Sequence, residues 1–317
     1  MCRKISVKKT KEILSTASDG DVEILNLIVG SCKNISKESN EEICLSWLLL
    51  CDKKGRTPLH LASMNGHVNV LNYIWKEILQ ATKNKKVKKQ LIDMNDHKGR
   101  TALFYASAFG HDEVVTYLLN REASLEACTN ENHISPRSTP LMASAEKNTL
   151  KCFELLLDAN ANVMNQRKDG ADALYMASRY GNHQIIRMLA VNNKIEGIVN
   201  QETFHGRTAI MTAALHGHIE ACKELHECGA KLNYQDNDKL TALILATHEG
   251  HLLLIRWLVV NGANIEIKDK HGGSAIDAAL GNGYSEIVNF LIQSQHIQKH
   301  YAGVPELKSK IINDLIR

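Results

Sequence analysis

One thirteen-residue phrase recurs seven times along the chain, and this recurrence limits the fold more than any other feature of the sequence. The first copy reads GRTPLHLASMNGH and spans residues 55–67. The period follows from the equivalent apolar residue of each copy: Leu59, Leu103, Leu141, Leu174, Ile210, Leu243 and Ile276. The steps between them are 44, 38, 33, 36, 33 and 33 residues, so the basic period is 33 and every deviation is an insertion. Such a period is typical of an array in which each repeat is one supersecondary unit.

Each copy predicts two helices joined by a tight turn. Thr57 is suited to cap the first helix, and Pro58 to occupy its first turn, where a missing N–H costs nothing. Gly66 predicts the end of that helix, because glycine tolerates the left-handed backbone that ends many helices. The residues after His67 carry an apolar stripe for a second helix. One such pair cannot bury its own apolar face, so we expect neighbouring repeats to stack.

The phrase Thr57-Pro58-Leu59-His60-Leu61-Ala62 resembles the signature of the ankyrin-repeat family. The other copies depart from it at one to several positions, and Asp172 replaces the threonine in the copy at 170–182. The resemblance implies an all-α solenoid of stacked helix-turn-helix units with β-hairpin fingers between them. It also implies that the histidines of the repeat make hydrogen bonds between and within repeats.

We divide the chain into three parts. Residues 1–7 form a basic N-terminal segment, residues 8–303 the repeat array, and residues 304–317 a short C-terminal amphipathic helix or tail. Within the array, residues 8–50 have the helix-turn-helix rhythm without the threonine phrase and are predicted to cap the stack. Seven further repeats are predicted to start near residues 52, 96, 130, 168, 201, 236 and 269.

Two of the insertions carry features of their own. Residues 76–91 are expected to extend the second return helix, and they contain the lysine cluster Lys85–Lys89. This cluster has two interpretations, a nuclear-import signal or the solvated face of the extended helix. Residues 131–137 lengthen one finger. There, Ser135 before Pro136 is either a phosphorylation site or a product of turn chemistry.

Composition limits the location and the partners of the protein. The net charge of +3 gives no concentrated basic face beyond the lysine cluster, so no nucleic acid is expected. The eight cysteines are scattered and form no C-x-x-C pair, which favours reduced thiols. No apolar run is long enough to span a bilayer, and residues 1–10 lead into no signal-peptide stretch. We predict a monomeric protein of the cytoplasm, with the nucleus as a second location and no membrane insertion.

No catalytic, cofactor or metal site is predicted. The sequence contains no phosphate-binding loop, dinucleotide fingerprint, nucleophile elbow or zinc-protease motif. The strongest metal candidate is His218, Cys222 and His226, which lie four residues apart on one helical face. However, His218 is the histidine of the repeat, and other copies place Val, Ile or Leu where the other two lie. We interpret Cys222 as a core residue and His226 as a hydrogen-bonded ring inside the stack.

The predicted function is the binding of another protein, as an adaptor or scaffold. The resemblance places a partner on the concave surface formed by the finger tips and the first helices. Register assigns thirteen residues to that surface: Leu61, Met64, Asn65, Arg56, Arg100, Tyr105, Phe109, Lys147, Met176, Arg179, Tyr180, His216 and His248. An exposed strip with aromatic, Met and Arg side chains is typical of binding hot spots, and the alternative is that some of these side chains pack into the core.

The finger tips at the N-terminal end are basic, with Lys53, Lys54, Arg56, His97, Lys98 and Arg100, and those at the other end carry Asp236, Asp238, Asp269 and Lys270. The basic tips predict that an acidic segment of the partner lies at the N-terminal end. Three other functions stay open, namely an enzyme hidden in the array, a nuclear regulatory cofactor directed by the lysine cluster, and an effector delivered into a host cell. An enzyme would need a catalytic group outside the repeat register, and the sequence supplies none. The fold alone does not decide among the others.

Overall fold

A computed structural model describes residues 6–34, 46–130, 134 and 136–300 of the chain. Ser135 and the predicted C-terminal segment 304–317 lie outside the described residues, as do residues 1–5 of the basic N-terminal segment. The chain divides into two compact units, Met1–Lys168 and Asp169–Arg317. We describe each unit by itself, as unit 1 and unit 2.

Seventeen α-helices lie in the described part of the chain. Unit 1 contains α1 (Val7–Asp19), α2 (Val22–Asn34), α4 (Pro58–Met64), α5 (Val68–Ala81), α6 (Lys85–Ile92), α7 (Ala102–Phe109), α8 (Asp112–Leu119), α9 (Pro140–Lys147) and α10 (Leu150–Asp158). Unit 2 contains α11 (Ala173–Arg179), α12 (His183–Val191), α13 (Ala209–Leu215), α14 (Ile219–Glu227), α15 (Ala242–His248), α16 (Leu252–Val260), α17 (Ala275–Gly281) and α18 (Ser285–His300). Among these helices none is long and apolar enough to cross a membrane.

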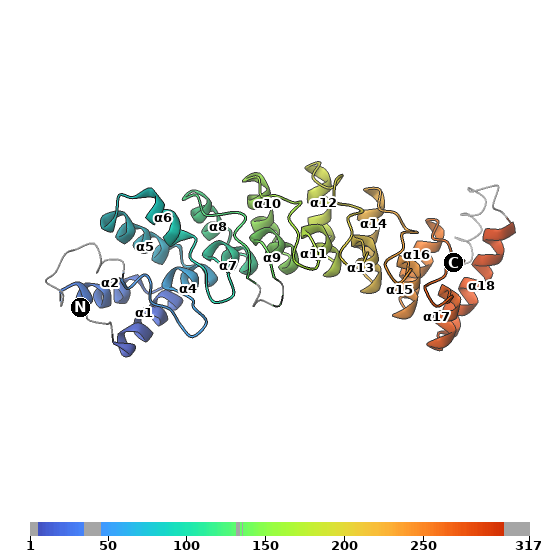
Figure 1. Ribbon diagram of the computed structural model, residues 1–317, viewed down its shortest axis with the longest axis horizontal. Helices are drawn as coiled ribbons and strands as arrows, with labels where there is room; N and C mark the ends of the chain where they lie inside the picture. Colours follow the sequence, from blue (N-terminus) through green and yellow to red (C-terminus); the bar gives the residue numbers. More distant parts are fainter. Residues whose placement is uncertain (1–5, 35–45, 131–133, 135, 301–317) are drawn as a thin grey trace. The chain divides into compact units, whose positions relative to one another are not determined.

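Within each unit the helices stack in two layers (Figure 1). In unit 1 the first helices α1, α4, α7 and α9 pack on one another in chain order, and the return helices α2, α5, α8 and α10 do the same. In unit 2 the first layer contains α11, α13, α15 and α17, and the second contains α12, α14, α16 and α18. The predicted all-α stack of helix pairs is therefore confirmed in both units.

In the seven repeats that carry it, the phrase of the sequence begins the first helix as expected. Thr101 Oγ1 accepts a hydrogen bond from the Phe104 backbone N–H at 3.2 Å, which caps the start of α7. Thr57 N–H donates to His60 Nδ1 at 3.1 Å, so in this copy the histidine completes the cap. The equivalent apolar residue is buried in six copies and partly exposed in the seventh, at Ile276. This residue anchors each pair in the stack.

The turn glycines are required by both backbone and packing. Gly66 has φ +81°, a conformation that strains any residue with a side chain. A Cβ atom added there would lie 2.7 Å from His111 Nδ1 of the next repeat. The turn glycine of one repeat therefore lies against the histidine ring of the following repeat.

The fingers differ from the predicted β-hairpins, because turns and no strands are assigned to them in the described residues. In the first finger, Asp52 N–H donates to Arg56 O at 3.0 Å, and the tip turns back at once. The tip then bonds to its neighbour, since His97 N–H donates to Lys54 O at 3.0 Å. Each finger is too short for a ladder of its own, so the hairpin form is not confirmed.

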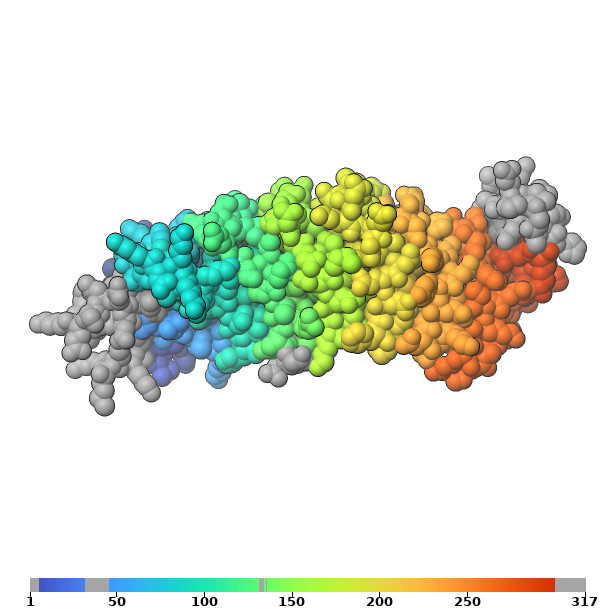
Figure 2. All heavy atoms as spheres, turned by 45° about the horizontal axis from the view of Figure 1, so that its top comes forward, coloured from blue at the N-terminus to red at the C-terminus, as the bar shows by residue number. Residues whose placement is uncertain are grey.

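The lysine cluster lies on a separate helix and does not extend α5, so that part of the prediction is wrong. Helix α5 ends at Ala81, where Thr82 is extended, and α6 begins after Asn84. Asn84 Oδ1 accepts from Lys86 N–H at 2.9 Å and so caps the new helix. Helix α6, cyan in Figure 2, lies on the surface of unit 1 and is anchored by the buried side chains of Leu91 and Ile92.

Candidate functional site

The histidines that follow the turn glycines hold neighbouring repeats together. Their Nε2 atoms lie within hydrogen-bond distance of a carbonyl oxygen in the preceding repeat: His67 to Ser18 at 2.8 Å, His111 to Met64 at 2.8 Å, His218 to Arg179 at 3.1 Å and His251 to Leu215 at 3.1 Å. A carbonyl oxygen only accepts, so each ring donates. The structural role that the family resemblance implied for these histidines is confirmed.

In unit 1 the acidic residues of the first two fingers point inward. Asp52 accepts from the backbone of Lys54 at 2.8 Å and forms an ion pair with Arg56 at 2.6 Å. Asp96 accepts from the Lys98 backbone at 2.8 Å and forms an ion pair with Arg100 at 2.7 Å. Burial opposes the ionisation of both carboxyls, but the hydrogen bonds from these arginines outweigh it and lower the pKa of each. Both carboxylates are thus neutralised inside their own fingers.

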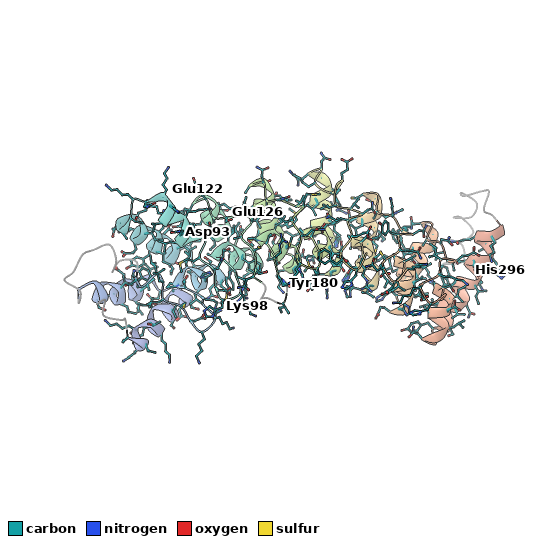
Figure 3. All side chains as sticks on the ribbon, in the orientation of Figure 1. Asp93, Lys98, Glu122, Glu126, Tyr180 and His296 are labelled. Atoms are coloured by element: carbon teal, nitrogen blue, oxygen red, sulfur yellow. The ribbon has the colours of Figure 1, made fainter. Side chains whose placement is uncertain are left out.

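The basic residues at the tips of these fingers point outward. Lys53, Lys54 and Lys98 are exposed, and none of them forms an ion pair with another described residue. In Figure 3, Lys98 lies toward one edge of unit 1, and Glu122 lies toward the opposite edge. The finger edge of unit 1 therefore presents uncompensated positive charge to the solvent.

A series of aromatic contacts connects the second finger with helix α7. The guanidinium of Arg100 lies 4.7 Å from the ring centroid of Tyr105. The Tyr105 ring stacks on Phe109 at a centroid separation of 6.4 Å, and its hydroxyl donates to Asp96 at 2.8 Å. Phe109 itself is 58% exposed. The stack joins the basic finger edge to one solvent-facing aromatic ring.

The thirteen predicted binding residues fall into three groups. Six are exposed: Phe109, Lys147, Arg179, Tyr180, His216 and His248. Four are partly exposed, namely Arg56, Met64, Asn65 and Arg100. The remaining three, Leu61, Tyr105 and Met176, are buried, so the prediction that they face the solvent is wrong.

The physical reason for that error lies in the packing of a short first helix. Such a helix contacts the preceding repeat, the following repeat and its own return helix, as α7 contacts α4, α9 and α8. Only its last turn then reaches the solvent. Tyr105 is buried further because its hydroxyl is bound by Asp96. The positions next to the turn, such as Phe109 and Tyr180, are the ones that stay accessible.

The candidate metal ligands on α14 do not form a cluster. Among the described residues no group of three His, Cys, Asp or Glu side chains lies close enough to hold a metal ion. Burial raises the pKa of Cys222 to about 12, so the thiol stays protonated as a core residue would. His226 packs edge-on against Trp257 at 5.6 Å, and its Nδ1 is buried without a hydrogen-bond partner. The prediction that the His226 ring is hydrogen-bonded is therefore wrong for its Nδ1 atom.

Unit 2 uses the charges of its fingers differently. Asp238 forms an ion pair with Lys270 of the next finger at 2.5 Å. Asp236 forms another with Arg207 at 3.2 Å. The ion pairs of unit 2 therefore join different fingers.

The sequence analysis missed the inward-facing aspartates of unit 1. The spacing from Asp52 to Arg56 and from Asp96 to Arg100 is the same, and this repetition was a usable signal.

Comparison with known proteins decides the family. The pattern of the family described as ankyrin repeats (3 copies) matches residues 13–127, 78–167, 125–203, 141–236 and 210–301. The chain belongs to the ankyrin-repeat family. Ankyrin repeats are protein-interaction modules, and the ankyrin array here covers both units.

Two curated relatives are similar to part of the ankyrin array. NF-kappa-B inhibitor zeta of Homo sapiens is 28% identical over 192 residues, and its counterpart of Mus musculus gives the same values. The match covers 60% of this chain and 23% of each relative. The chain thus matches less than a quarter of the length of these relatives. Their name describes them as inhibitors of NF-kappa-B.

Proposed function

We propose that this ankyrin-repeat protein is an adaptor that binds a segment of another protein along the finger tips and the exposed ends of its first helices. The observation that carries the proposal is the exposure of Phe109 and Tyr180, at 58% and 46%, where the first helices end. Burying an aromatic ring against a partner stabilises a complex more than most other contacts do. Polar groups near these rings form hydrogen bonds within the array, as His111 does with Met64 O and His218 with Arg179 O.

The relatives support a regulatory form of this role. They are similar to 60% of this chain, and their name assigns them an inhibitory role toward NF-kappa-B. We infer that this chain regulates a partner protein by binding it and not by modifying it chemically. The enzyme alternative would need a catalytic group outside the repeat register, and no catalytic motif of the sequence supplies one.

Affinity capture tests the proposal. Wild-type protein and the variant Phe109→Ala/Tyr180→Ala are used to capture proteins from a cell lysate, after circular dichroism has established that both are folded. The matched control is Leu79→Ala/Leu253→Ala, which removes two apolar residues of similar exposure, 48% and 71%, from return helices. We expect specific proteins to be captured by wild type and control and lost with the aromatic variant. Equal capture by all three would exclude the first-helix ends as the binding site.

A nuclear role is the second candidate, and the lysine cluster supports it. Lys85, Lys86 and Lys89 are exposed on α6, although Lys89 also pairs with Asp93 at 3.0 Å. Changing Lys85, Lys86, Lys88 and Lys89 to Ala tests the signal by localisation of the tagged protein. An unchanged distribution would eliminate the import role and leave the lysines as a solvated helix face.

A further inference from the structure

The finger edge of unit 1 has a fixed arrangement of charge. Its tips are bonded to one another: His97 N–H donates to Lys54 O at 3.0 Å, and Asn130 N–H donates to Lys98 O at 3.0 Å. The Asn130 side chain adds a bond to His97 O at 2.9 Å. The exposed lysines of the first two fingers therefore stand on one connected edge, and their spacing is set by the stack of repeats.

The carboxylates of these fingers cannot compensate this charge. Asp96 is buried and already accepts from Lys98 N–H, from Arg100 and from the Tyr105 hydroxyl. Asp52 is likewise held by its own finger, through Lys54 N–H and Arg56. The Asp–Arg pairs inside these fingers are neutral in sum, and the lysines exposed at the tips are cationic.

The same edge continues onto an apolar contact point. Arg100 pairs with the carboxylate of Asp96 and lies over the ring of Tyr105, and the Tyr105 ring stacks on the exposed Phe109. These contacts connect the second finger, which carries Lys98, with an exposed aromatic ring at the end of α7. A binding surface of this kind favours a chain that carries negative charge and at least one apolar side chain.

We propose that the finger edge of unit 1, Lys53, Lys54 and Lys98 together with Phe109, binds an acidic protein segment that carries an apolar side chain. The proposal rests on the proposed adaptor function and names the chemistry of its partner. A nucleic acid fits less well, because strong phosphate binding needs many cations in one tract and this edge offers three unpaired lysines. Acidic residues of the partner pair with the lysines, and its apolar residue covers Phe109.

Labelled peptides test this proposal by fluorescence anisotropy on the full chain. Adjacent helices of a stack lie about 8–10 Å apart, so a peptide of about ten extended residues covers neighbouring fingers. The probe is a polyglutamate peptide with one central Phe, compared with a polylysine peptide of the same length and with polyglutamate that lacks the Phe. We expect the first to bind more tightly than both others, with an affinity that falls as ionic strength rises.

Variants locate the bound peptide. Lys53→Glu/Lys54→Glu/Lys98→Glu is expected to weaken binding by on the order of tenfold or more. Lys83→Glu/Lys85→Glu/Lys86→Glu changes the net charge equally, but on and beside α6, and is expected to leave the affinity within about twofold. Phe109→Ala is expected to abolish the advantage of the Phe-containing probe, whereas Leu79→Ala is expected to keep it.

Three outcomes overturn the proposal. Equal loss of binding in the two lysine variants would mean that net charge alone attracts the peptide. Tighter binding of a single-stranded oligonucleotide than of the peptide, lost in the finger variant, would assign the edge to nucleic acid. Absence of peptide binding, in a protein that still captures cellular partners through Phe109 and Tyr180, would refute the acidic segment while leaving the adaptor function standing.

Discussion

Two buried aspartates, one in each unit, meet opposite surroundings. In unit 1, Asp96 accepts hydrogen bonds from two backbone N–H groups, from Arg100 and from the Tyr105 hydroxyl. In unit 2, Asp172 caps α11 through the Tyr175 N–H at 2.7 Å, and no ion pair joins it to another described residue. Burial opposes the charge of both. It prevails at Asp172, where it raises the pKa to about 7, and it is outweighed at Asp96, where the pKa is lowered.

This difference teaches that burial alone does not decide whether a carboxylate stabilises the array. A buried carboxylate stabilises the fold when charged donors surround it, and destabilises the fold when it replaces a neutral cap. Asp96 holds a finger of the proposed binding edge. Asp172 stands where five other copies have threonine and one has serine, and it stabilises α11 less as the pH rises. Three substitutions test this comparison.

Asp96→Ala is expected to have the largest effect. It leaves Arg100 without its partner and removes several charged hydrogen bonds, so we expect the free energy of unfolding to fall by about 3 kcal/mol near neutral pH. Chemical denaturation followed by circular dichroism measures this. Because the pKa of Asp96 is lowered, its contribution is present above the usual value of 3.8 and is lost as pH falls below it. A loss that is equally large at about pH 2 would contradict the electrostatic explanation.

Asp172→Thr is expected to act in the opposite direction. A threonine restores the cap of other copies and removes a buried charge, so we expect a gain of about 2 kcal/mol at about pH 8. The raised pKa means that wild type loses stability as pH rises from 3.8 toward about 7. The advantage of the variant should therefore disappear near pH 4. Melting temperatures across this range measure it, and a gain independent of pH would indicate a packing effect.

Lys270→Ala is expected to have the smallest effect. The ion pair with Asp238 joins two fingers of unit 2, but both side chains are about half exposed. Water and salt screen such pairs, so we expect no measurable change of the melting temperature. Amide exchange at the finger tips provides a second readout. A clear destabilisation that salt does not reduce would show that exposed pairs hold the fingers of unit 2 as firmly as Asp96 holds those of unit 1.

Much of the fold could be predicted from the sequence, because each repeat spells out its own helix starts and turns. Thr57 and Gly66 mark the ends of a helix through local chemistry, and local chemistry is readable from the sequence. The break before α6 was also readable, since Thr82 and Asn84 are residues that bind nearby backbone in place of continuing a helix. The length of the insertion concealed this signal.

The candidate site was less predictable, because exposure depends on what neighbouring repeats cover. Phe109 and Tyr180 follow from register alone, since they lie beside the turn. Tyr105 has the same residue character and a helical position only four residues earlier, yet it is buried and bound to Asp96. No local sequence pattern shows that Tyr105 binds Asp96, a residue of the finger. Residue type identified the chemistry of the surface, and only the packing identified which members of it are accessible.

The contact between a turn and the ring of the next repeat has a direction along the chain. In all four described pairs the histidine donor lies in the later repeat and the acceptor in the earlier one, as with His111 and Met64 or His251 and Leu215. A gene duplication that copies one full period therefore supplies a donor for the copy before it and an acceptor for the copy after it. Such an array can gain or lose a period in evolution without any repair at the junction. A lengthened period also keeps the contact, because the His111 ring still lies against Gly66 although the step between these two repeats is 44 residues.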